Sequence, residues 1–217
     1  MTEAKEMETL LDSIAAKATC AEGAVIPVAV SARHAHLSRD TLERLFGKNY
    51  ELQVHRPLPQ RGQFSAEETV TLIGPRGRME GVRLMGPPRQ HDQVEISRSD
   101  AVRLGIDVPL RQSGDLASTP RITVLGPKGG AVIDGVICAR RHIHCNEQDA
   151  RRLGIVDGQV VRVKLSGHAR DAIFGDIVVR VAPEFSLQLH LDTDEANAAG
   201  VVSGDYGTLC SIQDGAS

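Results

Sequence analysis

Hydrophobic and polar positions along the chain predict many short strands, most of them followed by a tight turn or a short helix. Runs such as 25–31, 70–73, 122–125 and 160–163 are rich in β-branched residues, as expected for strands buried on one or both faces. The helical stretches between them span roughly two turns. This pattern predicts a mostly β protein of small barrels capped by short α-helices, rather than a doubly wound sheet.

Four strand-to-helix junctions repeat one arrangement of residues. Each has a helix-capping side chain, and in the last three an acid stands three residues later, as in a capping box, and a glycine ends the helix. The caps are Ser38, Ser97, Asn146 and Asp192. Two residues before each cap stands a side chain that can bind a metal ion: His36, Glu95, His144 and His190. The recurrence suggests that the chain contains two related barrels.

Two of these junctions carry a second histidine, in Arg33-His34-Ala35-His36 and Arg141-His142-Ile143-His144. Alternate side chains of a strand point to the same face, so both imidazoles of one copy can reach one metal ion. The candidate ligands divide into two triads: His34, His36 and Glu95, and His142, His144 and His190. Imidazole and carboxylate ligands suit zinc, and three protein ligands with one open position are typical of catalytic zinc. The sequence therefore predicts two zinc ions per chain.

Other polar residues have simpler explanations beside a functional one. Arg89 follows the rigid Gly86-Pro87-Pro88 segment and can hold a phosphate or carboxylate through two hydrogen bonds, although an ordinary surface arginine is the commoner case. Cys145 alternates with His144 and is expected in the core. The remaining histidines considered lack the shared offset and are expected to be surface or core residues: His55, His91 and His168.

The positions of proline, glycine and apolar residues predict the structure of several further segments. Residues 1–23 predict a separate amphipathic helix, which either lies on the body of the protein or docks into a groove on a partner. Residues 48–67 predict a loop or a small hairpin excursion. Pro27 predicts an edge or irregular strand at 25–31. The Gly-Pro-basic-Gly turns at 74–77 and 126–129 are expected to be hairpin tips whose basic side chains aid solubility.

Composition narrows the classes of function. The 217 residues have a net charge of -3, which argues against nucleic acid as a partner. No apolar run approaches the length of a membrane span and no secretory signal is seen, so a soluble intracellular protein with reduced cysteines is expected. The phosphate-binding loop, the nucleophile elbow and the dinucleotide fingerprint are all missing. Kinase, hydrolase and dehydrogenase activities therefore lose their usual support.

From about residue 25 to residue 210 the sequence resembles the PduL-type phosphotransacylases (phosphate propanoyltransferases). The resemblance rests on these stretches, in order: Ile26-Pro27-Val28, Ser31-Ala32-Arg33-His34-Ala35-His36-Leu37-Ser38, Gly62-Gln63-Phe64, Ala66-Glu67-Glu68-Thr69-Val70, Arg89, Gln93-Val94-Glu95-Ile96-Ser97-Arg98, Arg141-His142-Ile143-His144 and His190-Leu191-Asp192-Thr193-Asp194-Glu195-Ala196-Asn197. It implies two intertwined β-barrels, one from 24–33 with 141–210 and the other from 34–140.

The resemblance also implies an activity and a site. The reaction is the exchange of a short acyl group, with propanoyl expected, between coenzyme A and phosphate, and other short chains remain open. The two triads correspond to the ligands of two zinc ions, and Arg89 matches the catalytic arginine that binds phosphate. We expect the triad with Glu95 to hold the coenzyme A sulfur. The all-histidine triad and Arg89 are then expected to hold phosphate.

Partners and location follow from the same resemblance. Family members inside bacterial microcompartments carry an N-terminal encapsulation helix, so residues 1–21 are expected to bind shell proteins and to direct the chain to the microcompartment lumen. A homo-oligomer without nucleic acid or membrane partners is expected. The alternative is a non-catalytic binding or adaptor module with structural histidines, because 146–155 and Asp157-Gly158 are also similar to double-psi barrel modules.

Overall fold

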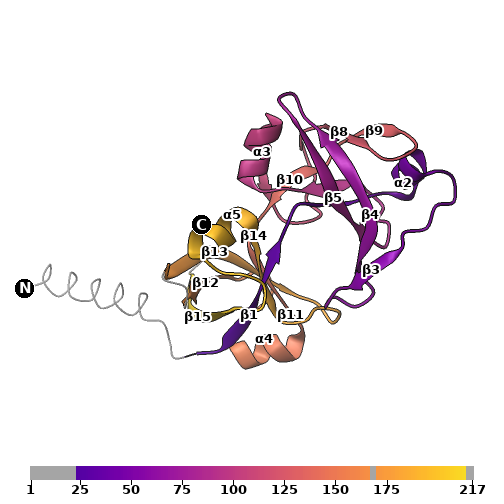
Figure 1. Ribbon diagram of the computed structural model, residues 1–217. Helices are drawn as coiled ribbons and strands as arrows, with labels where there is room; N and C mark the ends of the chain where they lie inside the picture. Colours follow the sequence, from indigo (N-terminus) through magenta and orange to yellow (C-terminus); the bar gives the residue numbers. More distant parts are fainter. Residues whose placement is uncertain (1–22, 167–169, 214–217) are drawn as a thin grey trace, which may run out of the picture. The chain divides into compact units, whose positions relative to one another are not determined.

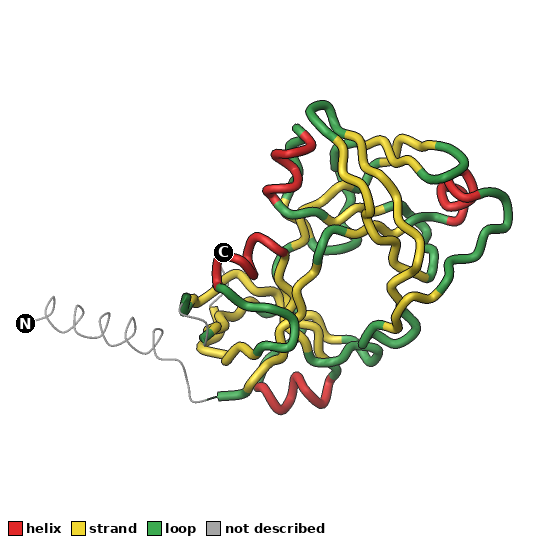
Figure 2. The backbone as a smooth tube through the Cα atoms, viewed as in Figure 1, coloured by secondary structure: helices red, strands yellow, loops and turns green. Residues whose placement is uncertain are grey.

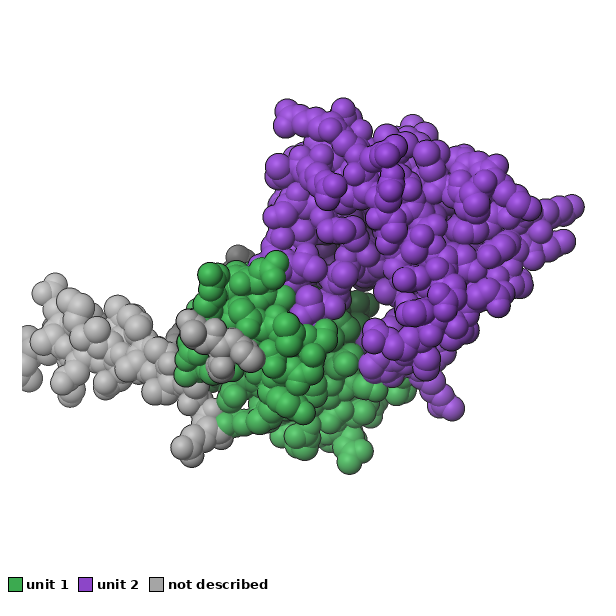
Figure 3. Space-filling model, in the orientation of Figure 1, with its two compact units in different colours: residues 1–29, 141–191, 196–217 green, residues 30–140, 192–195 purple. Residues whose placement is uncertain are grey.

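The computed structural model describes residues 23–166 and 170–213 and shows a mostly β protein, which confirms the predicted class (Figure 1; Figure 2). The chain divides into two compact units (Figure 3). Within the described ranges, unit 1 comprises the residues up to 29, 141–191 and those from 196 on, and unit 2 comprises 30–140 and 192–195. Each unit therefore combines distant parts of the sequence. The helix predicted over 1–23 and His168 lie outside the described residues, apart from Gly23.

Unit 1 contains a closed barrel whose strand order is β1-β14-β11-β13-β12-β15. The strands are β1 Val25–Ser31, β11 His142–Cys145, β12 Val160–Leu165, β13 Ala172–Val181, β14 Gln188–Asp192 and β15 Tyr206–Gln213. Two helices accompany this part of the chain, α4 Glu147–Leu153 and α5 Thr193–Ala199. Alternate residues of β12 are fully buried, namely Val161, Val163 and Leu165. Aliphatic side chains rather than aromatic rings fill the barrel.

Strand β1 is not an edge strand, so the edge position expected from Pro27 is wrong. β1 lies between β14 and β15 in the closed barrel, with Pro27 opposite Tyr206. Proline has no N–H to donate, but the N–H of the next residue, Val28, donates to the Asp205 carbonyl at 2.7 Å. Closure of the barrel leaves no edge at which a proline would be favoured. The ladder bond lost at one residue is tolerated because its neighbour is paired.

Unit 2 is built on a nine-stranded sheet of order β7-β10-β6-β2-β5-β4-β8-β9, with β3 paired to β4. Its strands are β2 His34–His36, β3 Val54–Pro57, β4 Phe64–Ile73, β5 Arg78–Gly86, β6 Gln93–Glu95, β7 Leu110–Arg111, β8 Ile122–Leu125, β9 Gly130–Ile133 and β10 Val136–Ala139. Helices α2 Arg39–Phe46 and α3 Arg98–Leu104 pack their leucines into its core. The β3–β4 pairing confirms a hairpin within 48–67.

The four predicted helix starts are all present. Side chains of three caps accept a hydrogen bond from the backbone N–H three residues on: Ser38, Ser97 and Asn146. At the fourth, Asp192 and Glu195 each bond the other's backbone N–H, at 2.8 and 3.0 Å, which completes a capping box. Asp100, the acid three residues after the cap Ser97, has a shorter side chain than Glu195. Its carboxylate accepts a hydrogen bond from the Arg33 side chain. No helix in the described ranges combines the length and apolar character needed to cross a membrane.

The two Gly-Pro-basic-Gly turns have a role beyond that of exposed tips. The N–H of Arg76 donates to the Leu104 carbonyl at the end of α3, and that of Lys128 to the Leu45 carbonyl near the end of α2, at 3.0 and 2.9 Å. A Cβ on Gly74 would collide with that Leu104 carbonyl. Both basic side chains are exposed, as predicted. The turns therefore supply donors to helix carbonyls that would otherwise lack partners.

Candidate functional site

In unit 2 the strand register brings together the first predicted triad, here named the carboxylate cluster: His34, His36 and Glu95. β2 runs antiparallel to β6 and places His34 directly opposite Glu95. Residues opposite each other in an antiparallel pair share a face, and His36 lies on that face because it is two residues from His34. The three ligand atoms lie within 4.8 Å of one another. The spacing is that of groups able to surround one ion.

Unit 1 repeats this arrangement in the histidine cluster: His142, His144 and His190. β11 runs antiparallel to β14 and places His142 opposite His190. Their rings stack at 4.8 Å between centroids, and the His144 ring lies 4.7 Å from that of His190. Again the three ligand atoms lie within 4.8 Å of one another. The structure thus groups all six candidates as the sequence does, and their role as ligands stays a prediction.

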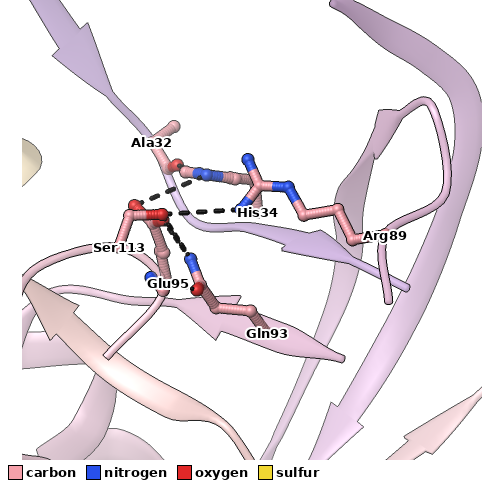
Figure 4. Close-up of polar contacts among 7 residues, drawn as sticks. Ala32, His34, Arg89, Gln93, Glu95 and Ser113 are labelled. Atoms are coloured by element: carbon pink, nitrogen blue, oxygen red, sulfur yellow. Dashed lines mark hydrogen bonds and ion pairs between the residues drawn. The ribbon is translucent and has the colours of Figure 1, made fainter. Parts of the chain in front are cut away.

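The hydrogen bonding of His34 leaves it suited to a cation. Its Nδ1 lies 2.9 Å from the Ala32 carbonyl, which can only accept, so Nδ1 carries a proton (Figure 4). In the neutral ring, Nε2 then presents a lone pair, and it lies 3.6 Å from Oε2 of Glu95. Two acceptor atoms that face each other are stabilised by a positive ion between them. A backbone carbonyl that orients the ring is common behind metal-binding histidines.

The most deeply buried histidine of each cluster, His36 in one and His144 in the other, is neutral. The pKa of His36 falls to about 2, chiefly through burial and further through the charges of His34 and Arg89. Its Nδ1 is buried with no hydrogen-bond partner among the described residues. Burial, with His142, His190 and Arg180, lowers the pKa of His144 to about 2 as well. Neutral imidazoles are the form that binds zinc, so these residues fit that metal.

Arg180 lies next to the histidine cluster and was not predicted from the sequence. It is the register partner of His144 on β13, and its guanidinium lies 5.7 Å from the ring centroid of Phe185. Phe185 in turn stacks on His144 at 3.9 Å. A lone arginine in a strand gives no local signal. The pairing of β11 with β13 is what brings it to the site.

Arg89 lies beside the carboxylate cluster, within unit 2. Its backbone N–H donates to the Leu37 carbonyl at 2.9 Å, and its Nη1 is 3.5 Å from Oγ of Ser113. Its charge also contributes to the low pKa of His36. These contacts all lie within unit 2, and the expected pairing of Arg89 with the all-histidine triad stays a prediction. Its binding of phosphate stays a prediction.

The histidines and the cysteine that were not expected to bind metal lie where the sequence predicts. His55 is exposed and lies 3.0 Å from Glu67, and His91 is exposed. Cys145 is fully buried, which confirms its place in the core. Burial raises the pKa of Cys145 to about 11 and that of Cys138 to about 12. Both thiols stay protonated at neutral pH, so neither supplies a thiolate nucleophile.

Comparison with known proteins gives a consistent result. Residues 27–202 match the family model of phosphate propanoyltransferases. A phosphate propanoyltransferase of Thermotoga maritima is 51% identical over 181 residues, which is 83% of this chain and 86% of that protein. That of Salmonella typhimurium is 48% identical over 176 residues, 81% of this chain and 83% of that protein. That of Listeria monocytogenes is 40% identical over 202 residues, 93% of each.

Proposed function

Because the chain belongs to the phosphate propanoyltransferase family, and is thus an acyltransferase, we propose that it exchanges a propanoyl group between coenzyme A and phosphate, in either direction. The observation that carries the proposal is the pair of three-residue clusters, each with its ligand atoms within 4.8 Å of one another. Family membership disfavours the alternative of a non-catalytic adaptor module.

Each cluster holds one zinc ion in this proposal. Neutral His36 and His144, and the facing lone pairs of His34 and Glu95, support it. When bound, zinc supplies positive charge that stabilises a coenzyme A thiolate and the oxyanion of the acyl group under attack. The donor sets differ, because one includes a carboxylate and the other only imidazoles.

The chain's own residues orient the other substrate. The Arg89 guanidinium donates two hydrogen bonds to phosphate oxygens and fixes a third oxygen toward the thioester carbonyl carbon. A C–O bond then forms to phosphate, the C–S bond breaks, and sulfur leaves as coenzyme A thiolate. The protonated thiols of Cys138 and Cys145 disfavour an acyl-enzyme on either of these two cysteines and so support direct transfer.

Release of free thiol from propanoyl-CoA tests the reaction and the metal together. We expect release that depends on added phosphate, falls to background after chelation, and returns when zinc is added, because the proposed charge stabilisation requires the ion. The assay follows a thiol-reactive dye, with zinc content measured on the same sample. Zinc-free protein with full activity would contradict the metal assignment. Protein with neither zinc nor activity would favour the adaptor module.

Residues 1–21 form a shell-binding segment in this proposal and direct the enzyme to a bacterial microcompartment lumen. The amphipathic spacing of Met7, Leu10, Leu11 and Ile14 supports this. We expect deletion of 1–21 to leave turnover unchanged and to abolish co-purification with assembled shells. Replacing Leu10 and Leu11 by Glu should have the same effect, because both belong to the apolar positions of that spacing. Unchanged encapsulation of both variants would show that the segment serves the protein's own body.

A further inference from the structure

Gln93 is a buried polar side chain next to the carboxylate cluster. It is 1% exposed and stands at the start of β6, two residues before Glu95. Residues two apart in a strand point to the same face, so its amide shares the face of the candidate ligands (Figure 4). A primary amide at such a depth is stable only when its polar atoms have partners.

The partners of Gln93 fix the direction of its amide. Nε2 donates to Oε1 of Glu95 at 2.5 Å and to Oγ of Ser113 at 2.8 Å, and Oε1 accepts the Gly114 N–H at 2.8 Å. A backbone N–H can only donate and an ionised carboxylate can only accept. The opposite orientation would therefore break the bonds to both Gly114 and Glu95. One side chain thus holds a candidate ligand and a neighbouring turn.

The first bond decides which oxygen of Glu95 faces His34. Because Oε1 is held by Gln93, Oε2 is the oxygen that faces Nε2 of His34, at 3.6 Å. Hydrogen-bonded partners behind a ligating carboxylate fix its orientation and tune its affinity for the metal. Gln93 therefore favours single-oxygen coordination by Glu95.

The second bond reaches Arg89. Ser113 lies in the segment between β7 and β8, and its Oγ contacts both Gln93 Nε2 at 2.8 Å and Arg89 Nη1 at 3.5 Å. The bond from Gly114 to Gln93 holds the same segment in place. One hydroxyl thus connects the guanidinium of Arg89 to the amide that also bonds Glu95.

From this network we infer that Gln93 is a positioning residue that aligns Glu95 as a metal ligand and, through Ser113, Arg89 as the phosphate-binding group. The inference rests on the proposed function. Gln93 would thus connect metal binding at the carboxylate cluster with phosphate binding at Arg89. Displacement of its amide would disturb both the zinc ion and the phosphate.

Gln93→Met keeps the length of the side chain and removes its hydrogen bonds. We expect one of the two zinc ions to be bound about 10- to 100-fold more weakly, the usual effect of losing such a partner, and the KM for phosphate to rise. Ser113→Ala removes the hydroxyl between Gln93 and Arg89 but keeps the bonds of Gln93 to Glu95 and Gly114. It should therefore raise the KM for phosphate and leave both zinc affinities unchanged. Gln159→Met is the matched control, because Gln159 accepts one hydrogen bond from Val156 in a turn of unit 1.

Competition with a chromophoric chelator measures each zinc affinity, and steady-state kinetics separates KM from kcat. If the Gln93→Met and Ser113→Ala proteins both match wild type in zinc affinity and in KM for phosphate, the inference about Gln93 is wrong, while the proposed function still stands. A purely structural role would lower the unfolding temperature without singling out one ion, and would overturn the inference too. Wild-type protein that binds no zinc would overturn the proposed function, and the inference with it.

Discussion

Replacing His142 by Ala is expected to remove one zinc ion and to reduce turnover at least about 100-fold, the scale on which a lost charge-stabilising group lowers catalytic rates. His142 lies at the start of β11, and its ring contacts both other members of the histidine cluster. Two remaining imidazoles do not make the three-ligand set typical of catalytic zinc. The fold should persist, because the ring of His142 is half-buried and the adjacent Ile143 supplies the core contact.

Phosphate-dependent thiol release, zinc content and thermal unfolding measured on one preparation check this expectation. His55→Ala is the control, since His55 is exposed and pairs with Glu67 in the β3–β4 hairpin. It should retain two zinc ions and full activity. A folded His142→Ala protein with near-normal turnover would remove the histidine cluster from the mechanism.

Local signals in the sequence were enough to locate the candidate ligands. The caps at Ser38, Ser97 and Asn146 are encoded within a few residues, and so is the shared face of His34 and His36. The division of the six candidates into two triads follows from the repeat, because equivalent junctions of two related barrels should have equivalent roles. The strand pairings that place His34 opposite Glu95 and His142 opposite His190 then give both triads the same geometry.

The neighbours of the two clusters could not be predicted from the sequence, because pairings between distant segments bring them there. Arg180 reaches its cluster through the register of β13 with β11. Ser113 lies in a segment without regular structure, and nothing local relates it to Arg89. Gln93 did carry a signal, since it alternates with Glu95, but a glutamine has too many ordinary roles for that spacing to single it out. The edge position expected from Pro27 was wrong, because the order of strands in the sheet, not local composition, decides which strands lie at an edge.

The repeat extends beyond the candidate ligands to the charged residues around them. Each unit has two histidines on one strand, a third group opposite on the antiparallel neighbour, and an arginine whose charge lowers the pKa of the buried histidine: Arg89 for His36 and Arg180 for His144. The difference is the third group, a carboxylate in one unit and an imidazole in the other. An ion held by neutral imidazoles alone keeps its full positive charge, whereas Glu95 offsets part of it. The two sites should therefore differ in their preference for anionic ligands.

Arg89→Ala is expected to lower kcat/KM for phosphate by about 100-fold or more, in line with the loss of a preorganised cationic donor. The guanidinium is half-buried beside the carboxylate cluster, and its backbone is held to Leu37. Arg89→Lys keeps the charge but not the planar pair of donors, so it should recover only part of the loss. The KM for propanoyl-CoA should change little in either variant.

Initial rates over a phosphate series at saturating propanoyl-CoA measure this effect, and zinc content separates it from loss of metal. Arg39→Ala is a matched control, since Arg39 is exposed and pairs with Glu51 at 2.9 Å. The order wild type, Lys, Ala in kcat/KM for phosphate, with two zinc ions in all three, would identify Arg89 as the group that binds phosphate. Equal values for Lys and Arg at this position would mean that charge alone suffices and that two-point hydrogen bonding has no part. An unchanged Ala variant would require another cation. Arg180 beside His144 is then the residue to replace, because its charge already lowers the pKa of that candidate ligand in the histidine cluster.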